Sequence, residues 1–543
     1  MKFEVAEPEV EMLSTESRAD LRLRYFCYAV LVIVLVVFSF IRIRLRNTPL
    51  ERDEGEYAYA AQLMLQGDPP YHLAYTMKLP GTYVAYAVIM AVFGQTIPAI
   101  RIGMLVILIA NTVLVFFLGR QLFGILAGAA AAAFYTILAN RLTTLSLDGH
   151  ATHFIVLMVL AGTLLLLRAI KTQRMPALFG SGLCFGLAFL MKQQGIVFAV
   201  FGFLFWLYSE WKRRDNWRGV ISQGRVLAAG MILPYLLTCL IAWSMGVFRE
   251  FWFWTVSYSA EYESLTSLSF VWTAFTYTVP WFPRPINIWL AAGFGLTAVF
   301  WNRRARQQKV LILSFALFSF LAVCPGFYFR PHYYLVMLPA VALLAGLAIS
   351  ATYEYLQERN ASAKITLIPI AIFILMYFSA VYGQRKYLFK MSPLQVNREM
   401  HAAHGFPEAI AVADYVRNHS SSQDRIAVIG SEPEIYFYSH RRSASGYIYT
   451  YPLMEQQKFA FRMQSEMMHE IENAQPRFVV FVDNWWSWGW NPGWDASEPH
   501  MNIFTQIRDY LDSHYDLMAE VPIKGSAYNL WGAPCRYYIF KRK

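Results

Sequence analysis

Residues 25–41 read YFCYAVLVIVLVVFSFI, and residues 52–64 shortly after them read RDEGEYAYAAQLM. The first stretch is an uninterrupted apolar run close to the length of a membrane-spanning helix. It is not a cleaved signal peptide, because residues 38–42 (FSFIR) offer no small-residue cleavage site. The second stretch places acidic residues where the chain leaves the apolar run. Together the two stretches predict a membrane anchor followed by a polar segment at the membrane surface.

The composition of the whole chain extends this reading. Of its 543 residues, 57% are apolar and 15% are charged, whereas soluble domains have about 45–50% and about 25%. These values exclude a disordered chain, a disulfide scaffold and an ordinary cytosolic enzyme. The excess of 47 basic over 36 acidic residues lies before residue 384, which fits membrane loops and argues against nucleic-acid binding. The five cysteines predict no disulfide framework and no CxxC metal site.

Apolar runs along the chain predict about eleven membrane spans. They are residues 25–41, 100–118, 122–139, 152–167, 176–191, 195–208, 226–246, 286–301, 310–324, 333–350 and 365–382. A shorter apolar stretch, 81–93, is predicted to be a re-entrant or surface-lying helix. The fold class is therefore a polytopic α-helical membrane protein with a membrane domain at 25–383.

Basic clusters between these runs predict the orientation. The clusters are Arg18, Arg22 and Arg24; Arg168, Lys171 and Arg174; Lys212, Arg213, Arg214 and Arg218; and Arg303, Arg304, Arg306 and Lys309. Placed inside, they put the N-terminus (1–24) in the cytoplasm of a bacterium and the C-terminus in the periplasm. The predicted outer loops are then 47–80 and 247–285. Arg42, Arg44 and Arg46 fall on the wrong side of this scheme.

Residues 384–543 are near neutral and alternate between two kinds of pattern. Residues 407–418 and 454–473 have helical periodicity, whereas 425–429 and 477–482 are strand-like. This alternation predicts a small soluble α/β domain.

Several polar residues stand where chemistry is conceivable. From Tyr57 onward, apolar residues recur at helical spacing and predict an amphipathic helix on the outer surface. Asp53 and Glu54 at its start are either a helix cap in a solvated loop or a functional pair. Lys192 lies between two apolar runs, where an ionisable group either has a function or extends to the interface.

Other candidates also have two readings. Asp148 is a polar turn residue or a site residue, and Glu261 contacts an acceptor or is solvated. His150 and His153 lie three residues apart on a possible helix, but no third ligand is evident, so no metal site is predicted.

The order of the motifs resembles the GT-C glycosyltransferases, and within them the protein O-mannosyltransferases and the lipid A aminoarabinose transferases. The motifs are Asp53-Glu54, Gly67-Asp68, Lys78-Leu79-Pro80-Gly81, Ser146-Leu147-Asp148, Leu190-Met191-Lys192 and Arg330-Pro331-His332-Tyr333-Tyr334. The resemblance covers about residues 50–346. It departs from the family pattern at Leu79, which separates Lys78 from Pro80.

The resemblance implies an inverting transferase that moves one sugar from a polyprenyl-phosphate donor to a protein, lipid A or another glycolipid or glycan, on the periplasmic face. Such a reaction needs a carboxylate base for the acceptor and cations for the leaving phosphate. In this assignment Asp53 and Glu54 are catalytic. The donor phosphate binds Lys78, Lys192, Arg330 and His332, and the substrates are positioned by Tyr57, Asp148 and Glu261. No cofactor is firmly predicted, and a divalent metal stays an open alternative that nothing in the sequence supports.

Two rival functions remain from other classes. One is a transporter or flippase of a lipid-linked sugar, which usually shows inverted repeats and broken helices at the membrane midplane. The other is a non-catalytic scaffold that binds a polyprenyl lipid or a glycan. The notable charges gather at one face and a large outer domain follows, which favours the transferase. The sequence does not name the sugar or the acceptor.

Overall fold

The computed structural model describes residues 18–213, 217–264, 267–278, 284–402, 404–489, 499–525 and 533–543. Three predictions fall partly on other residues. Most of the predicted cytoplasmic segment 1–24, the basic residue Arg214 and parts of the predicted loop 247–285 lie outside the described residues.

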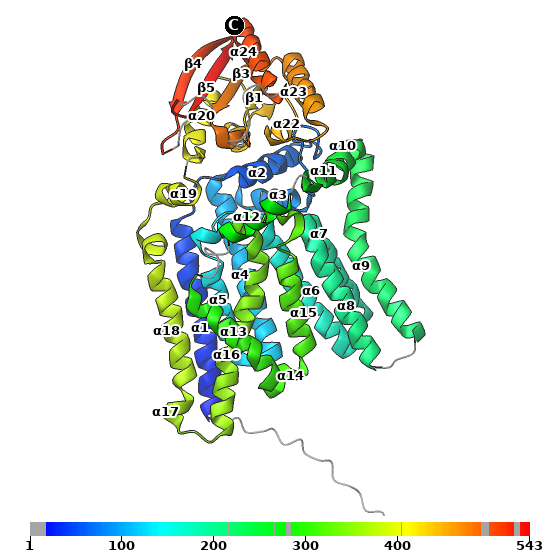
Figure 1. Cartoon of the computed structure of the whole chain (residues 1–543), viewed down its shortest axis with the longest axis vertical. Coiled ribbons are helices and arrows are strands. Elements are labelled where there is room, and N and C mark those ends of the chain that lie inside the picture. The colour runs from blue at the N-terminus through cyan, green and yellow to red at the C-terminus, as the bar shows by residue number, and fades with distance from the viewer. Residues whose placement is uncertain are drawn as a thin grey trace, which may run out of the picture.

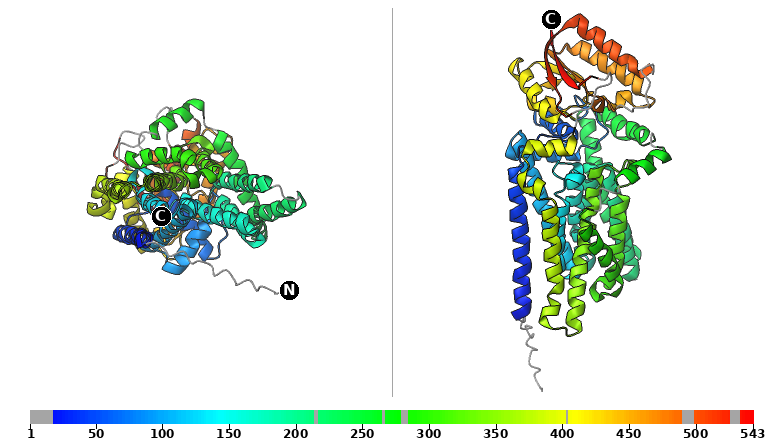
Figure 2. Two further views of the ribbon diagram at one scale, coloured as in Figure 1. Left: turned by 90° about the horizontal axis from the view of Figure 1, so that it is seen from below. Right: turned by 60° about the vertical axis from the view of Figure 1, so that its left-hand side comes forward.

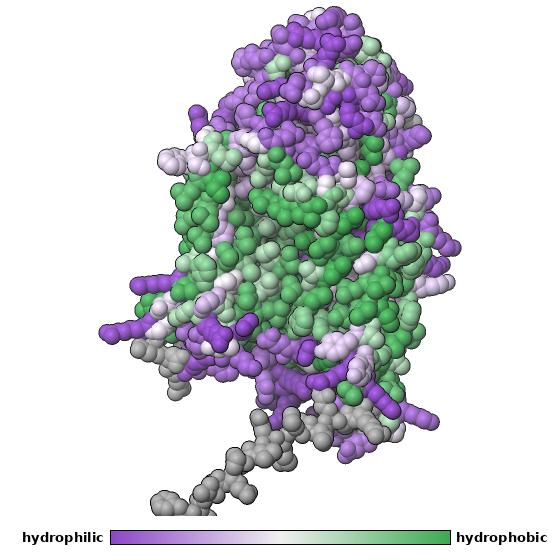
Figure 3. Space-filling view, turned by 180° about the vertical axis from the view of Figure 1, so that it is seen from behind, coloured by the Kyte–Doolittle hydropathy of each residue, from purple (hydrophilic) through white to green (hydrophobic). Residues whose placement is uncertain are grey.

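The predicted apolar runs all coincide with helices, with shifted ends. These helices are α1 (Arg18–Arg44), α4 (Ile97–Phe123), α5 (Ile125–Leu138), α6 (Ala151–Thr172), α7 (Met175–Met191), α8 (Ile196–Arg213), α9 (Trp217–Ser244), α13 (Ile286–Trp301), α15 (Lys309–Leu321), α16 (Leu338–Glu358) and α18 (Ile368–Gly383). In the described part of the chain, seven helical stretches are long and apolar enough to cross a membrane, and five shorter apolar helices accompany them. They form a bundle with a small domain at one end (Figure 1). On the face that Figure 3 shows, a hydrophobic band crosses the bundle, with hydrophilic surface above and below it. The predicted polytopic helical class is confirmed.

Small residues let the central helices approach one another closely. Every residue of α5 after Ile125 is buried, and a Cβ atom at Gly119 of α4 would lie 2.9 Å from the Cα of Gly128 in α5. On the other side of α5, a Cβ at Gly346 of α16 would lie 2.5 Å from the carbonyl oxygen of Ala127. Close backbone approach of this kind is how helices associate where no hydrophobic effect separates them from lipid. The core of the bundle is therefore centred on α5.

Shorter elements connect the long helices. They are α10 (Phe248–Trp252), α11 (Ser259–Ser264), α12 (Leu268–Thr278), α14 (Arg303–Gln307), α17 (Ala363–Thr366), α19 (Pro393–His401), 3₁₀ helices at Leu142–Thr144, Gln193–Gly195, Pro325–Phe327 and Pro331–Met337, and π-helical turns at Phe253–Tyr258 and Lys386–Lys390.

Helix α2 (Arg52–Leu65) lies across the end of the bundle (Figure 1). A capping box starts it, because Glu51 and Glu54 each accept a hydrogen bond from the other's backbone N–H. The sequence predicted a helix on the outer surface, but the soluble domain covers α2. A Cβ at Gly55 would lie only 2.6 Å from the backbone nitrogen of Glu434.

Helix α3 (Gly81–Phe93) packs against α2 and α4. Val84, Val88 and Val92 form an exposed apolar stripe on it. This stripe agrees with the predicted re-entrant or surface-lying helix.

The C-terminal part contains a five-stranded sheet in the order β2-β1-β3-β5-β4. Its strands are β1 (Arg425–Ile429), β2 (Arg442–Ser443), β3 (Phe478–Asp483), β4 (Tyr515–Pro522) and β5 (Arg536–Arg542). β1 is parallel to β2 and β3, whereas β5 is antiparallel to β3 and β4. Its helices are α20 (Phe406–Asn418), α21 (Glu434–Ser439), α22 (Tyr451–Met454), α23 (Ala460–Ala474) and α24 (Asn502–His514). The predicted small α/β domain is confirmed, and it stands on one end of the bundle (Figure 2).

The arginines that opposed the charge rule have structural partners. Arg42 is buried and donates to Asn140 Oδ1 at 2.6 Å and to the carbonyl oxygen of Ser146 at 2.6 Å. Arg44 donates to the carbonyl oxygens of Tyr387 and Leu388, both at 2.9 Å. Arg42 and Arg44 are therefore held by the fold and do not report on orientation, whereas Arg46 is exposed and donates to the carbonyl oxygen of Ile43.

Candidate active site

Asp53 and Lys78 form an ion pair at the start of α2. Lys78 Nζ lies 2.8 Å from Asp53 Oδ1 and 2.5 Å from Glu56 Oε2. Burial raises the pKa of Asp53, but the charge and the hydrogen bond of Lys78 more than offset this and hold the pKa well below its usual range. Asp53 is therefore an ionised carboxylate at neutral pH, held in place by a cation.

The ring of Tyr57 packs against the ion pair of Asp53 and Lys78. Lys78 Nζ lies 4.7 Å from the centroid of the Tyr57 ring, a cation–π distance. Tyr57 is buried and packs against Tyr83 and Tyr86, so its ring has little freedom to move. The predicted positioning residue thus contacts a predicted phosphate ligand.

Glu54 follows Asp53 in sequence but faces another direction, as neighbouring residues on a helix do. Its two oxygens lie 2.5 and 2.8 Å from the guanidinium nitrogens of Arg101 in α4, and it accepts from the backbone N–H of Gly149. Arg101 also approaches Asp148 at 3.8 Å, and Asp148 lies 3.1 Å from His401 Nε2. This bonding anchors α2 and the segment before α6. The catalytic role of Glu54 and the positioning role of Asp148 stay predictions.

Lys192 and Arg330 have aromatic partners instead of acidic ones. Lys192 Nζ lies 3.8 Å from the centroid of the Tyr333 ring, and Arg330 donates to Tyr262 Oη at 3.1 Å. Among the described residues, neither forms an ion pair with a carboxylate. Burial lowers the pKa of Lys192, and Lys78 and Arg330 are near enough to lower it further. The structure therefore brings the three predicted cations together.

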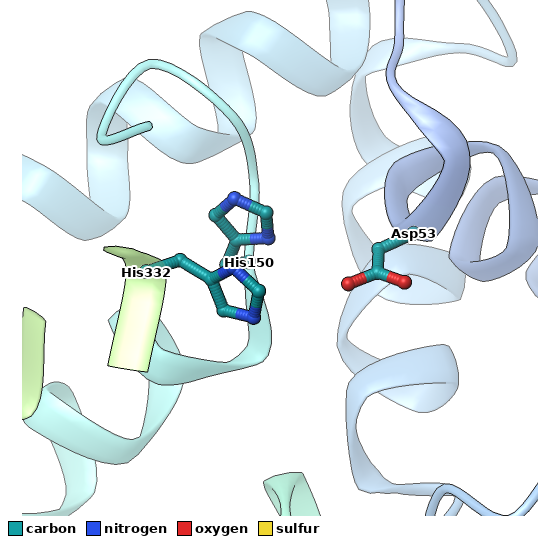
Figure 4. Close-up of side chains that lie close together, drawn as sticks. All are labelled: Asp53, His150 and His332. Carbon is teal, nitrogen blue, oxygen red and sulfur yellow. The ribbon is translucent and has the colours of Figure 1, made fainter. Parts of the chain in front are cut away.

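His332 lies against His150, with ring centroids 4.1 Å apart. Ligand atoms of these two histidines and Asp53 all lie within 4.8 Å of one another, and both rings are on the same side of the carboxylate (Figure 4). Burial lowers the pKa of His150 to about 4, so its ring is neutral at physiological pH and can bind a metal. The sequence paired His150 with His153. The structure replaces that partner with His332 and Asp53, which come from distant segments.

Glu261 is placed apart from this group. It pairs at 2.7 Å with Lys458 of the soluble domain. Nearby, Tyr258 donates to Glu455 Oε2 at 2.6 Å. These contacts join the segment after α9 to the soluble domain, and a substrate role for Glu261 stays a prediction.

Sequence reasoning missed several residues of the site. Glu56 lies three residues after Asp53, a spacing that puts both on one helix face. The sequence could therefore have predicted Glu56 as a site residue. Arg52 pairs at 3.2 Å with Glu432 of the soluble domain, and no local pattern could have shown that contact. Tyr333 was quoted only as part of a motif, yet its ring lies beneath Lys192.

Comparison with known proteins gives three findings. The first is a family described as dolichyl-phosphate-mannose-protein mannosyltransferase, which matches residues 78–243. That stretch holds Lys78, Asp148 and Lys192, whereas Asp53 and Arg330 lie outside it.

The second finding concerns curated relatives. Undecaprenyl phosphate-α-4-amino-4-deoxy-L-arabinose arabinosyl transferases from Pseudomonas aeruginosa and Pseudomonas paraeruginosa are 29% identical over 225 residues. The match covers 37% of this chain and 38% of each relative, so it spans well under half of their length.

The third finding concerns solved structures. ArnT from Cupriavidus metallidurans bound to undecaprenyl phosphate gives a TM-score of 0.57 at 14% identity, over 95% of this chain and 98% of that one. The archaeal oligosaccharyltransferase AglB from Archaeoglobus fulgidus, in complex with an inhibitory peptide and a dolichol-phosphate, gives 0.52 at 13% identity, over 94% and 75%. Such identities show a shared fold. The resemblance to the GT-C superfamily predicted from the sequence is confirmed.

Proposed function

We propose that this chain is an inverting glycosyltransferase that moves a sugar from a polyprenyl-phosphate donor to an acceptor at the membrane surface. One observation carries the proposal. An ionised carboxylate, Asp53, pairs with Lys78 and interacts electrostatically with Lys192 and Arg330, and the latter two have no acidic partner among the described residues.

The carboxylate supports a role as general base. In the transfer step the acceptor oxygen attacks the anomeric carbon, its proton passes to Asp53, and the bond from that carbon to the phosphate oxygen breaks. The electron pair leaves with the polyprenyl phosphate, and a single displacement inverts the anomeric centre. The partial exposure of Asp53 leaves room for an acceptor, and a base within hydrogen-bond reach typically contributes about 10²–10⁴-fold.

The cations support a role in holding the leaving phosphate. Lys78, Lys192 and Arg330 bring three positive charges against the two carboxylates of Asp53 and Glu56. A preorganised excess of positive charge stabilises negative charge that develops on a leaving group. The phosphate of a lipid-linked sugar supplies that charge, and the similar structure of ArnT was solved with undecaprenyl phosphate. The relatives' names further suggest an arabinose-like or mannose-like sugar.

The acceptor and the orientation belong to the same proposal. A soluble domain on the periplasmic side of a bacterial cytoplasmic membrane, with residues 25–383 as the membrane domain and 384–543 outside, gives lipid, glycan or protein acceptors access to Asp53. An impermeant maleimide on intact cells, in a background without native cysteines, tests this. It should label Ser422→Cys in the soluble domain and spare Arg303→Cys at the start of α14. The reverse pattern contradicts the orientation.

A transfer assay tests the function. The full chain is reconstituted in vesicles with labelled undecaprenyl-phosphate sugars and candidate acceptors. Asp53→Asn should lose about 10²–10⁴-fold of the transfer rate and still bind undecaprenyl phosphate. Asp516→Asn, which changes an exposed carboxylate of β4, serves as the matched control. Unchanged transfer in Asp53→Asn removes this residue from the mechanism. If the parent protein moves labelled lipid across the vesicle and transfers none, it is a flippase.

A further inference from the structure

A groove of about 920 Å³ opens where the soluble domain meets the end of α18. One wall is the π-helical turn Lys386–Lys390 with α19, and the other is α20 with the end of β4. Figure 1 shows α18 rising to this level and α19 lying just below α20. The groove therefore lies at the side of the molecule, at the same end of the bundle as α2.

The lining of the groove is rich in basic side chains. Lys386, Lys390, Arg398 and Lys524 face it, with Glu399 and Glu408 as its acidic residues. Glu408 is already paired with Arg398. Among the described residues, the three lysines form no ion pair. The groove therefore presents positive charge that the fold itself does not use.

The surroundings of the groove place it at the level of lipid headgroups. Tyr382, Phe389 and Leu394 beside it are 65%, 48% and 50% exposed, and the guanidinium carbon of Arg385 lies 3.9 Å from the centroid of the Tyr382 ring. Exposed aromatic and basic residues at the end of an apolar helix mark the membrane–water interface. The apolar rim can thus meet acyl chains while the lysines reach the headgroups.

This basic cluster differs from the arginines at the end of α1. Arg42 and Arg44 donate hydrogen bonds to buried partners, whereas the lysines of the groove are exposed. Exposed basic residues near an anionic bilayer surface gain about fivefold in binding for each charge. The positive-inside rule disfavours exposed lysines on the outer side of the membrane. An anionic lipid bound in the groove would offset this disadvantage.

We propose that this groove binds the phosphate headgroup of an anionic phospholipid in the leaflet on the soluble-domain side. The lysines hold the phosphate and the rim holds the acyl chains. Helix α19 carries Arg398 at the groove and, one turn later, His401, which lies 3.1 Å from Asp148. A bound lipid thereby steadies the helix that reaches the Glu54 and Asp148 network.

Photocrosslinking of the full chain tests this proposal with a readout independent of catalysis. A photoreactive residue is placed in the groove by Gln395→p-benzoylphenylalanine, in vesicles of three parts phosphatidylcholine and one part phosphatidylglycerol. Adducts are identified by mass spectrometry. Phosphatidylglycerol should dominate the adducts despite its lower abundance. Adducts in proportion to abundance, adducts to protein only, or no adduct overturn the proposal.

Charge removal then tests which residues hold the lipid. Lys386→Gln, Lys390→Gln and Lys524→Gln together should lower the yield of the phosphatidylglycerol adduct on the order of 100-fold at low ionic strength, at about fivefold for each charge. The control removes the same charge at the other end of the bundle, with Arg303→Gln, Lys309→Gln and Lys364→Gln, and should leave the yield unchanged. Thermal unfolding of both variants checks that they fold. An equal yield in a folded groove variant overturns the proposal.

Discussion

Two sets of cations in this protein have the same chemistry and opposite surroundings. Arg42, Arg52 and Arg101 are buried and bonded to carbonyl or carboxylate oxygens. Lys192 and Arg330 face tyrosines and have no acidic partner among the described residues. A buried charge without a partner is costly, so the arginines of the first set need their present partners to keep the protein stable. Their donors are not available to a ligand. The second set keeps its donors available, which is what binding of a phosphate requires.

Lys78 stands between the two sets. It is paired with Asp53 and Glu56 as a structural cation would be, yet it lies beside Lys192 and Arg330. The comparison therefore predicts three kinds of variant. Loss of a structural cation (Arg42, Arg52 or Arg101) should destabilise the fold, and loss of a spare cation (Lys192 or Arg330) should weaken donor binding alone. Loss of Lys78 should do both.

The largest expected effect on stability is that of Arg101→Met. This change leaves Glu54 buried without its cation and should lower the free energy of unfolding by about 3–5 kcal/mol. Unfolding of the detergent-solubilised protein measures it. Arg120→Met at the exposed end of the same helix is the control and should change stability by less than about 0.5 kcal/mol. Equal stability of the two variants would contradict the claim that buried, paired arginines such as Arg101 stabilise the fold.

A smaller, double effect is expected for Lys78→Met. Two carboxylates lose a charged partner, and the free energy of unfolding should fall by about 2–3 kcal/mol. Binding of undecaprenyl phosphate should also weaken by at least about tenfold, because a charge-assisted contact is lost. Unfolding and lipid-binding titrations are run on one preparation, with the exposed Lys171→Met as control. A variant that loses stability but binds the lipid normally would move Lys78 into the structural set.

Next in size is the pH dependence at Glu455, which joins the soluble domain to Tyr258. Burial raises the pKa of Glu455 to about 7 from a reference of 4.5. The folded state therefore keeps a proton that the unfolded state releases, so stability falls as pH rises from about 4.5 to about 7. Glu455→Gln removes this loss and should be more stable than the parent by about 3 kcal/mol at pH 8, but not at pH 4. Parallel stability curves across this pH range would contradict the assignment.

The smallest expected effect is that of metal removal. Three side-chain cations already surround the proposed phosphate position, so chelation with EDTA should change the transfer rate by less than about twofold. The group of Asp53, His150 and His332 makes the opposite result specific. The contrary result would be a large loss of transfer rate on chelation, recovery of the rate on addition of Mn²⁺ or Zn²⁺, and no such recovery in His150→Ala. It would show that a metal binds the phosphate together with Lys78, Lys192 and Arg330.

The sequence predicted what depends on local patterns. Apolar runs located the helices of the bundle. β1 and β3 were recognised as strands because each is a short, mostly apolar run. Asp53 and Lys192 stood out because each interrupts or follows an apolar run. Contacts between distant segments left no such trace. The stacking of His150 on His332, the covering of α2 by the soluble domain and the internal bonds of Arg42 arise only when the chain is folded.

The most direct test is the affinity for undecaprenyl phosphate when both cations without an acidic partner, Lys192 and Arg330, lose their charge. Lys192→Gln with Arg330→Gln should bind the lipid at least about 100-fold more weakly than the parent, at about tenfold for each charged contact. Its free energy of unfolding should stay within about 0.5 kcal/mol of that of the parent. Unchanged affinity together with lost stability would contradict the account, because Lys192 and Arg330 would then belong with Arg42, Arg52 and Arg101.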